Sequence, residues 1–166
     1  VNPMNLMFTD EVLTGFDTNY KVYPPIRGTN DRTALVEGLK DGTIDFIETH
    51  HTPQNIENKN LEFGYADYGV TMLETAFSVI QTAVANELTT NEIIDKIAIN
   101  PRQILGLEVP TIETGSDANL TIFAPDSTWK YSKTHSKSHN SPFLGKELKG
   151  KVLGIVNNGT WSFNDE

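Results

Sequence analysis

Residues 30–51 read NDRTALVEGLKDGTIDFIETHH, and this stretch predicts a helix that leads directly into a strand. Asn30 or Asp31 can cap the helix, and its apolar residues share one face. Gly42 is placed to end it, because glycine is common just past the last helical turn. The apolar run that follows predicts a buried strand over residues 43–51.

A second strand-like run, YKVYPPIRG at residues 20–28, precedes the helix and is ended by Pro24-Pro25. Strand, helix and strand with short links are typical of a parallel βαβ unit, so the expected fold class is α/β. Residues 1–10 are expected to form a further strand end. Functional residues in such folds lie at the C-terminal ends of strands, which draws attention to Thr49-His50-His51.

Two more helical regions follow a polar loop predicted at residues 55–68. Residues 71–86 carry apolar side chains at the helical period. Thr89 and Glu92 match a capping box that opens a helix through Ala98. Asn100-Pro101 is expected to restart a short helix that ends near Gly106.

The character of the chain changes after Leu107. Residues 110–126 and 145–163 are short β-prone runs broken by glycine and proline, and they predict a small antiparallel sheet. Residues 130–143 between them read as a polar loop. The predicted division is therefore residues 1–106 for the α/β part and residues 107–166 for the β part.

Composition limits the kind of protein and its partners. The chain has 166 residues, a net charge of −9 and no cysteine, so disulfides and thiolate zinc sites are excluded. No apolar run approaches the length that spans a bilayer, no signal-like start is present, and the expected location is the cytoplasm. Residues 1–129 carry 7 Lys and Arg against 19 Asp and Glu, which disfavours nucleic acid as a partner. The six lysines of residues 130–166 either form an ordinary solvated face or meet an acidic surface of another chain.

The adjacent His50 and His51 leave three readings open: a metal site, a catalytic site, or what remains of one. Imidazoles bind zinc well, but neighbouring residues on a strand point to opposite faces and rarely bind one metal together. His135 and His139 lie in the polar loop without a helical pattern, and they are interpreted as solvated.

Four stretches, residues 16–54, 68–77, 100–107 and 115–159, together resemble the C-terminal part of dihydroorotase, a cyclic amidohydrolase of pyrimidine synthesis. The resemblance covers nearly the whole chain. It implies the last strands and helices of a (β/α)₈ TIM-type barrel over residues 1–106, followed by part of a small β-sandwich. In that family, zinc-activated water attacks the ring amide of dihydroorotate and an aspartate shuttles the proton.

The residues that carry this chemistry in the family are altered here. Where the family reads Thr-Asp-His-Ala-Pro-His, this chain has Thr49-His50-His51-Thr52-Pro53-Gln54, so His50 stands at the position of the aspartate and Gln54 at that of a substrate-binding histidine. Where the family reads Thr-Pro-His-His-Leu, the chain has Met4 and Asn5 in place of the histidine pair. No intact catalytic residue and no metal are therefore expected at Met4, Asn5 and His50.

The substrate pocket is also expected to be degenerate. The family's Val-Asn-Pro-Pro-Leu-Arg appears here as residues 22–27, with Tyr23 in place of the asparagine and Arg27 kept. The positions of this degenerate pocket are Arg27, Tyr23, Gln54, Tyr68 and Gly69.

The preferred interpretation is a dihydroorotase-like protein that does not hydrolyse dihydroorotate. Non-catalytic relatives in the family support aspartate transcarbamoylase as scaffolds, which makes that enzyme the expected partner. A homo-oligomer, or an N-terminal half of the barrel, would cover the cut edge of the sheet. The alternatives are an active zinc-dependent amidohydrolase that opens a ring amide, and a purely structural half of a larger protein.

Overall fold

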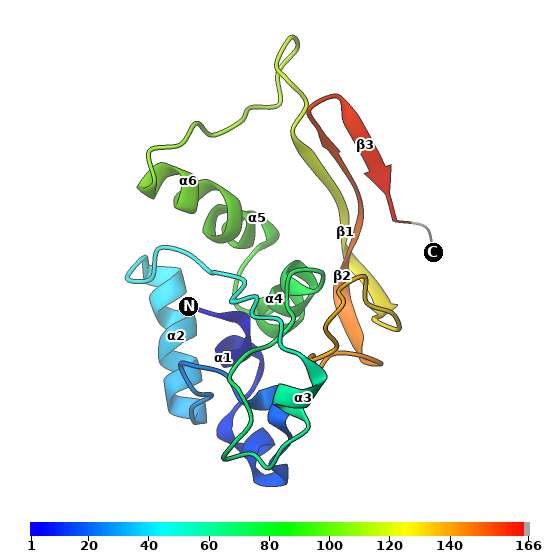
Figure 1. The fold of residues 1–166 in the computed structure, drawn as a ribbon. Coiled ribbons are helices and arrows are strands. Elements are labelled where there is room, and N and C mark those ends of the chain that lie inside the picture. Colours follow the sequence, from blue (N-terminus) through cyan, green and yellow to red (C-terminus); the bar gives the residue numbers. More distant parts are fainter. Residues whose placement is uncertain (165–166) are drawn as a thin grey trace.

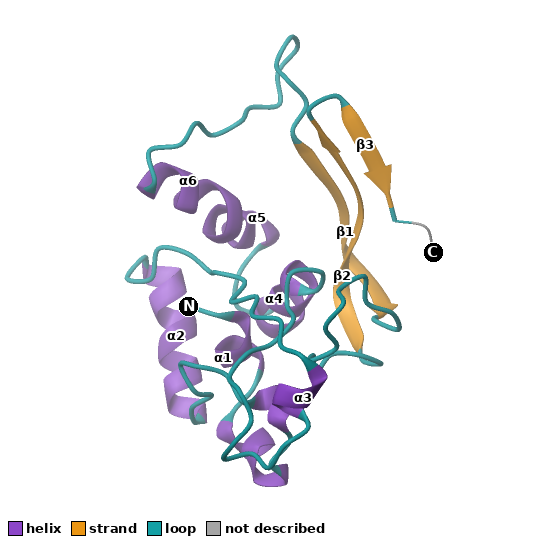
Figure 2. Cartoon of the chain, in the orientation of Figure 1, coloured by secondary structure: helices purple, strands orange, loops and turns teal. Residues whose placement is uncertain are grey.

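The computed structural model describes residues 1–164, in which a group of helices precedes a small sheet (Figure 1 and Figure 2). Among these residues, no helix has the length and apolar character needed to cross a membrane. The helices are α1 (Pro3–Met7), α2 (Thr29–Asp41), α3 (Ile56–Lys59), α4 (Ala76–Val84), α5 (Thr90–Ile94) and α6 (Asn100–Ile104), with 3-10 helices η1 (Asp10–Gly15) and η2 (Thr18–Tyr20) and a π-helical turn η3 (Asp95–Ile99).

The predicted antiparallel sheet is confirmed. Its strands are β1 (Leu120–Lys130), β2 (Glu147–Asn157) and β3 (Thr160–Phe163), in the order β1-β2-β3 with both pairs antiparallel. The β2–β3 hairpin turns at Asn158-Gly159, where both φ angles are positive, at 48° and 73°. Asn-Gly favours this turn because both residues tolerate the left-handed region.

Helix α2 confirms the helix predicted after the second run, but its start was placed wrongly. Gly28 is the N-cap and Thr29 the first helical residue, so neither Asn30 nor Asp31 caps it. Gly42 ends the helix with φ 84°, as predicted. The Thr89–Glu92 capping box is also confirmed, with Thr89 N donating to Glu92 Oε2 at 2.7 Å.

One further helix prediction and one loop prediction need correction. The helix predicted over residues 71–86 is shorter: α4 begins only at Ala76, residues 73–75 form a turn, and residues 71 and 72 are irregular. The loop predicted over residues 55–68 contains the single turn α3. The helix through Ala98 is present as α5 and η3, and it continues without interruption into α6.

The strands predicted in residues 1–10, 20–28 and 43–51 are not formed. Residues 3–7 are helical instead, because Asn2 accepts from Asn5 N at 3.2 Å as an N-cap and Pro3 suits the first turn. The other two segments lack a ladder: the last contributes a single parallel bridge, His51 to Val70. A strand needs a continuous row of backbone partners, and within residues 1–164 these segments meet partners only one at a time.

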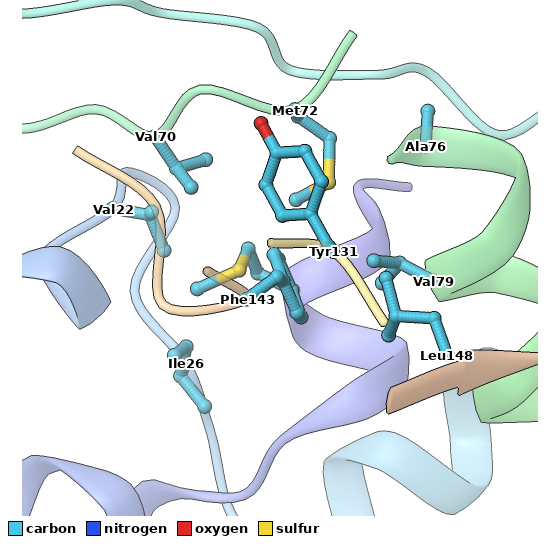
Figure 3. Close-up of a cluster of buried hydrophobic side chains, with 10 residues drawn as sticks. Val22, Ile26, Val70, Met72, Ala76, Val79, Tyr131, Phe143 and Leu148 are labelled. Atoms are coloured by element: carbon cyan, nitrogen blue, oxygen red, sulfur yellow. The ribbon is translucent and has the colours of Figure 1, made fainter. Parts of the chain in front are cut away.

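The core consists of two apolar clusters that meet at α1 and α4. Met4 and Val79 belong to the first cluster, and Leu6 and Ile80 to the second. In the first cluster, Tyr131, Phe143 and Leu148 lie among residues of the helical part such as Val70 and Met72 (Figure 3). Burying these apolar side chains ties the C-terminal segment to the helices.

Polar contacts strengthen the junction between α4 and the sheet. The indole Nε1 of Trp129 donates to Ser78 Oγ and to Gly150 O, each at 3.1 Å. Ser78 Oγ also donates to Gly150 O. Gly150 has φ 87°, and a Cβ there would lie 3.0 Å from Phe77 and Gln81, so only glycine allows β2 to approach α4 this closely.

Candidate functional site

His50 adopts a left-handed backbone conformation, with φ 51°. Its Nδ1 lies 3.5 Å from Oε1 of Glu48, and 22% of its side chain is exposed. A left-handed conformation is uncommon for a residue with a Cβ, and here it lies just before the Thr52-Pro53 segment. The imidazole therefore has one carboxylate neighbour at the position where the family carries its aspartate.

His51 takes different partners from His50. Its Nδ1 accepts from the backbone amides of Met72 and Leu73, each at 3.1 Å. Thr52 N donates to Val70 O at 2.8 Å, beside the His51–Val70 bridge. Because a neutral imidazole has one acceptor nitrogen, these bonds commit His51 to holding residues 70–73.

Four of the five predicted pocket residues are brought together. Gln54 Nε2 donates to Tyr68 O at 2.9 Å, and the rings of Tyr23 and Tyr68 pack edge to face, with centroids 5.8 Å apart. Gly69 N donates to Lys21 O at 3.0 Å, next to Tyr23. Gly69 has φ 140°, and a Cβ there would lie 2.5 Å from Thr52 O, so the close approach of the two segments requires glycine.

Arg27, the fifth pocket residue, lies in a separate groove of about 750 Å³. Asn5 and Glu48 line the same groove, so it brings together residues of two altered motifs and the residue just before the third. Asn5 is 9% exposed, and no group within residues 1–164 bonds its Oδ1. Met4 does not face this groove as a free ligand, because it is fully buried in the first core cluster.

These residues do not by themselves fit a zinc ion. Within residues 1–164, no three His, Asp or Glu side chains come close enough to share a metal, and His50 with Glu48 supplies only two. Zinc in an enzyme is usually held by at least three protein ligands. His135 and His139 are exposed in the polar loop, as predicted.

Two lysines that sequence reasoning missed hold the loop beside Tyr68 and Gly69. Lys59 is buried, and its Nζ donates to Asp67 O at 2.9 Å and to Gly69 O at 3.2 Å. Burial, and then the charge of Lys21, lower the pKa of Lys59 to about 8. Lys21 Nζ in turn donates to carbonyls of the loop and lies 4.8 Å from the Tyr68 ring centre. Nothing in the local sequence marks either lysine.

Glu74 was also missed, and it anchors the polar loop that follows β1. Its Oε1 accepts from Thr134 Oγ1 and Ser136 N at 2.8 Å, and its Oε2 accepts from His135 N at 3.0 Å. Burial raises the pKa of Glu74, but the hydrogen bonds from His135, Thr134 and Ser136 outweigh it and hold the pKa below its ordinary value. The carboxylate thereby fixes a loop some 60 residues along the chain.

Comparisons with known proteins bear out the resemblance to dihydroorotase. The chain is 44% identical over 160 residues to the dihydroorotase of Geobacter metallireducens, covering 95% of this chain and 38% of that protein. It is 44% identical over 156 residues to the dihydroorotase of a Thermoanaerobacter species, covering 92% of this chain and 36% of that protein. The chain thus spans less than two fifths of the length of these curated relatives.

Solved structures share the fold. The L-hydantoinase (dihydropyrimidinase) of Arthrobacter aurescens matches with a TM-score of 0.85 and 27% identity, over 96% of this chain and 38% of that one. The inactive dihydroorotase-like domain of a CAD-like multifunctional protein from Chaetomium thermophilum matches with a TM-score of 0.67 over 97% of this chain and 42% of that one. Its 22% identity shows a common fold alone.

The model of the amidohydrolase family matches residues 24–161, which is most of the chain. This span contains the His50–Gln54 segment, the residues around Tyr68, the strands β1 and β2, and the first two residues of β3. The chain therefore belongs to the amidohydrolase family.

Proposed function

We propose that the chain is part of a dihydroorotase-like protein of pyrimidine biosynthesis that does not hydrolyse dihydroorotate and instead serves as a structural partner of aspartate transcarbamoylase. The observation that carries the proposal is His50 at the position of the family aspartate, where Glu48 is the one acidic side chain paired with it within residues 1–164. Residues 1–106 are then the part that supplies the last strands and helices of a TIM-type barrel in the whole protein, with no paired strand formed by residues 1–106 within residues 1–164. Residues 107–166 are then part of a β-sandwich.

The chemistry of imidazole supports the loss of activity. An aspartate has two oxygens, so one can bind a metal while the other accepts a proton from the attacking water. A neutral imidazole has one acceptor nitrogen and cannot do both at once. His50 therefore fills the position without supplying both functions. Met4 and Asn5 stand where the family has histidines and add no imidazole, and Met4 is also buried in the core.

The basic C-terminal region is the proposed contact with the partner. Two of its lysines have partners within this chain: Lys146 Nζ donates to Tyr20 OH at 2.9 Å, and Lys149 Nζ pairs with Asp126 Oδ1 at 3.1 Å. Lys133 and Lys137 are exposed on the loop that Glu74 anchors. A fixed loop keeps its charges in place, which favours selective contact with an acidic surface.

Co-elution of the full-length protein with aspartate transcarbamoylase of the same organism tests the assembly. A stable complex is expected, and Lys137→Glu should weaken it while Lys40→Glu, an equal charge change on exposed α2, should not. Absence of a complex at micromolar concentrations would contradict the partnership. Equal weakening by both variants would contradict the proposed contact.

A second candidate, an active amidohydrolase for another cyclic amide, is favoured by the groove that keeps Arg27 beside Asn5 and Glu48. An arginine and an amide suit a carboxylate or a ring amide as ligand. This function would require zinc, with ligands beyond those of this chain. Tightly held zinc in the full-length protein, by elemental analysis, would support it, and zinc near zero would argue against it.

A further inference from the structure

Asn140 belongs to the polar loop between β1 and β2, yet it is only 4% exposed. Its Oδ1 accepts from Gln54 N and from Thr71 Oγ1, both at 3.1 Å. Its Nδ2 donates to Thr52 O at 3.2 Å, and its backbone carbonyl accepts from Thr71 N at 2.9 Å. One uncharged side chain therefore makes three hydrogen bonds to residues nearly 70 to 90 positions away.

Two of these bonds go to backbone groups of the Thr52-Pro53-Gln54 segment. Pro53 has no N–H, and Thr52 N is already bonded to Val70 O. The two groups on either side, Thr52 O and Gln54 N, both go to Asn140. With its backbone fixed, Gln54 extends its side chain to Tyr68 O.

The loop that carries Asn140 is itself held at both ends. Glu74 binds Thr134, His135 and Ser136 before it, and the fully buried Phe143 follows it in the first core cluster. Figure 3 shows Phe143 among side chains of the helical part. The loop therefore holds Asn140 in place, and the position of the Thr52–Gln54 segment depends on the C-terminal part of the chain.

We propose that Asn140 is a positioning residue of the candidate site: it fixes the Thr52–Gln54 segment and so sets where Gln54 meets Tyr68. This inference rests on the proposed function, because Gln54 is a pocket residue by its place in the family motif. Holding the Gln54 amide requires only the acceptor Oδ1 of Asn140, whereas holding Thr52 O requires the donor Nδ2. Integrity of the site then depends on the loop after β1.

Hydrogen–deuterium exchange of the full-length protein, read in overlapping peptides across residues 49–58, tests this. Asn140→Ala should raise exchange at the Gln54 amide about tenfold or more, because the amide loses the one partner it has within residues 1–164. Asn140→Asp keeps an oxygen that accepts from Gln54 N and should restore most of the protection. Thr71→Val is the matched control: it removes the other bond to Oδ1 and should leave Gln54 protected.

Unchanged exchange at Gln54 in Asn140→Ala would overturn the proposal. So would an equal rise in peptides from α2, which would mean general loosening. If Asn140→Ala does not fold, Asn140→Asp and Thr71→Val still decide, because the proposal requires Gln54 protection in both. The test needs no catalysis, so a protein found to hydrolyse dihydroorotate would refute the proposed function and leave this inference standing.

Discussion

The Nδ1 atom of His50 lies 3.5 Å from the Oε1 atom of Glu48, and this pair occupies the end of the segment where the family places its aspartate. The neighbouring histidine does not compensate, because His51 accepts from the amides of Met72 and Leu73. The two histidines thus have separate structural contacts, and the paired imidazoles do not form a joint metal site.

Restoring the carboxylate alone should not restore catalysis. In the full-length protein, His50→Asp is expected to leave dihydroorotate turnover at the buffer background, because Met4 and Asn5 still lack imidazoles. The reverse exchange in an active dihydroorotase is the control, and it should lower turnover at least about a hundredfold. Turnover by the His50→Asp variant that depends on zinc would show that the remaining residues still build a site.

Gly69 should tolerate no side chain. Gly69→Ala places a Cβ 2.5 Å from Thr52 O at φ 140°, so we expect a loss of about 2 kcal/mol or more in the free energy of unfolding. Gly64→Ala is the matched control, since a Cβ there meets nothing within 4 Å. Urea unfolding measures both variants, and equal midpoints would show that the two segments do not approach this closely.

Lys59 should make stability rise with alkaline pH. Its pKa is lowered to about 8 in the folded chain against 10.5 for the free side chain, so between these values the unfolded state binds more protons. Stability contributed by this group is therefore gained as pH rises through 8. Relative to Lys59→Met, the wild type should gain about 2 kcal/mol between pH 7 and pH 10.

Urea unfolding at several pH values measures the Lys59 effect. Lys40→Met, at an exposed position of α2, serves as the control and should show no such trend. If the difference in unfolding free energy between wild type and Lys59→Met stays constant over this range, burial does not lower the pKa of Lys59.

Much of the local structure could be predicted because it rests on local chemistry. Gly42 ends α2 by its left-handed conformation, and the Thr89–Glu92 box opens α5. Each depends on residues within a few positions of one another. The predicted strands in residues 20–28 and 43–51 failed for the opposite reason, since a strand is defined by distant backbone partners.

The site shows the same division. The motif pattern singled out Tyr23, Gln54, Tyr68 and Gly69, and the structure brings them together. The residues that hold them in place could not be predicted. In the sequence, Asn140 is one of many polar residues in a loop, and its side-chain amide reaches the Thr52–Gln54 segment only in the folded chain.

Glu74 should lose its stabilising effect in acid. Hydrogen bonds from the loop hold its pKa below the ordinary value despite burial, so its contribution is present above that value and is lost as pH falls through the folded pKa. Glu74→Gln should therefore melt below the wild type at pH 7, and the gap should close as pH falls from 5 to 3. Thermal unfolding across this range measures the gap, and a gap independent of pH would contradict a role for the charge.

The decisive measurement is turnover of dihydroorotate by the full-length protein in zinc-supplemented buffer. Ring opening should be no faster than in buffer alone, because His50 cannot both bind a metal and accept the proton of the attacking water. Zinc-dependent turnover that a chelator abolishes and that His50→Ala removes would contradict it, and would show that His50 serves a working catalytic site.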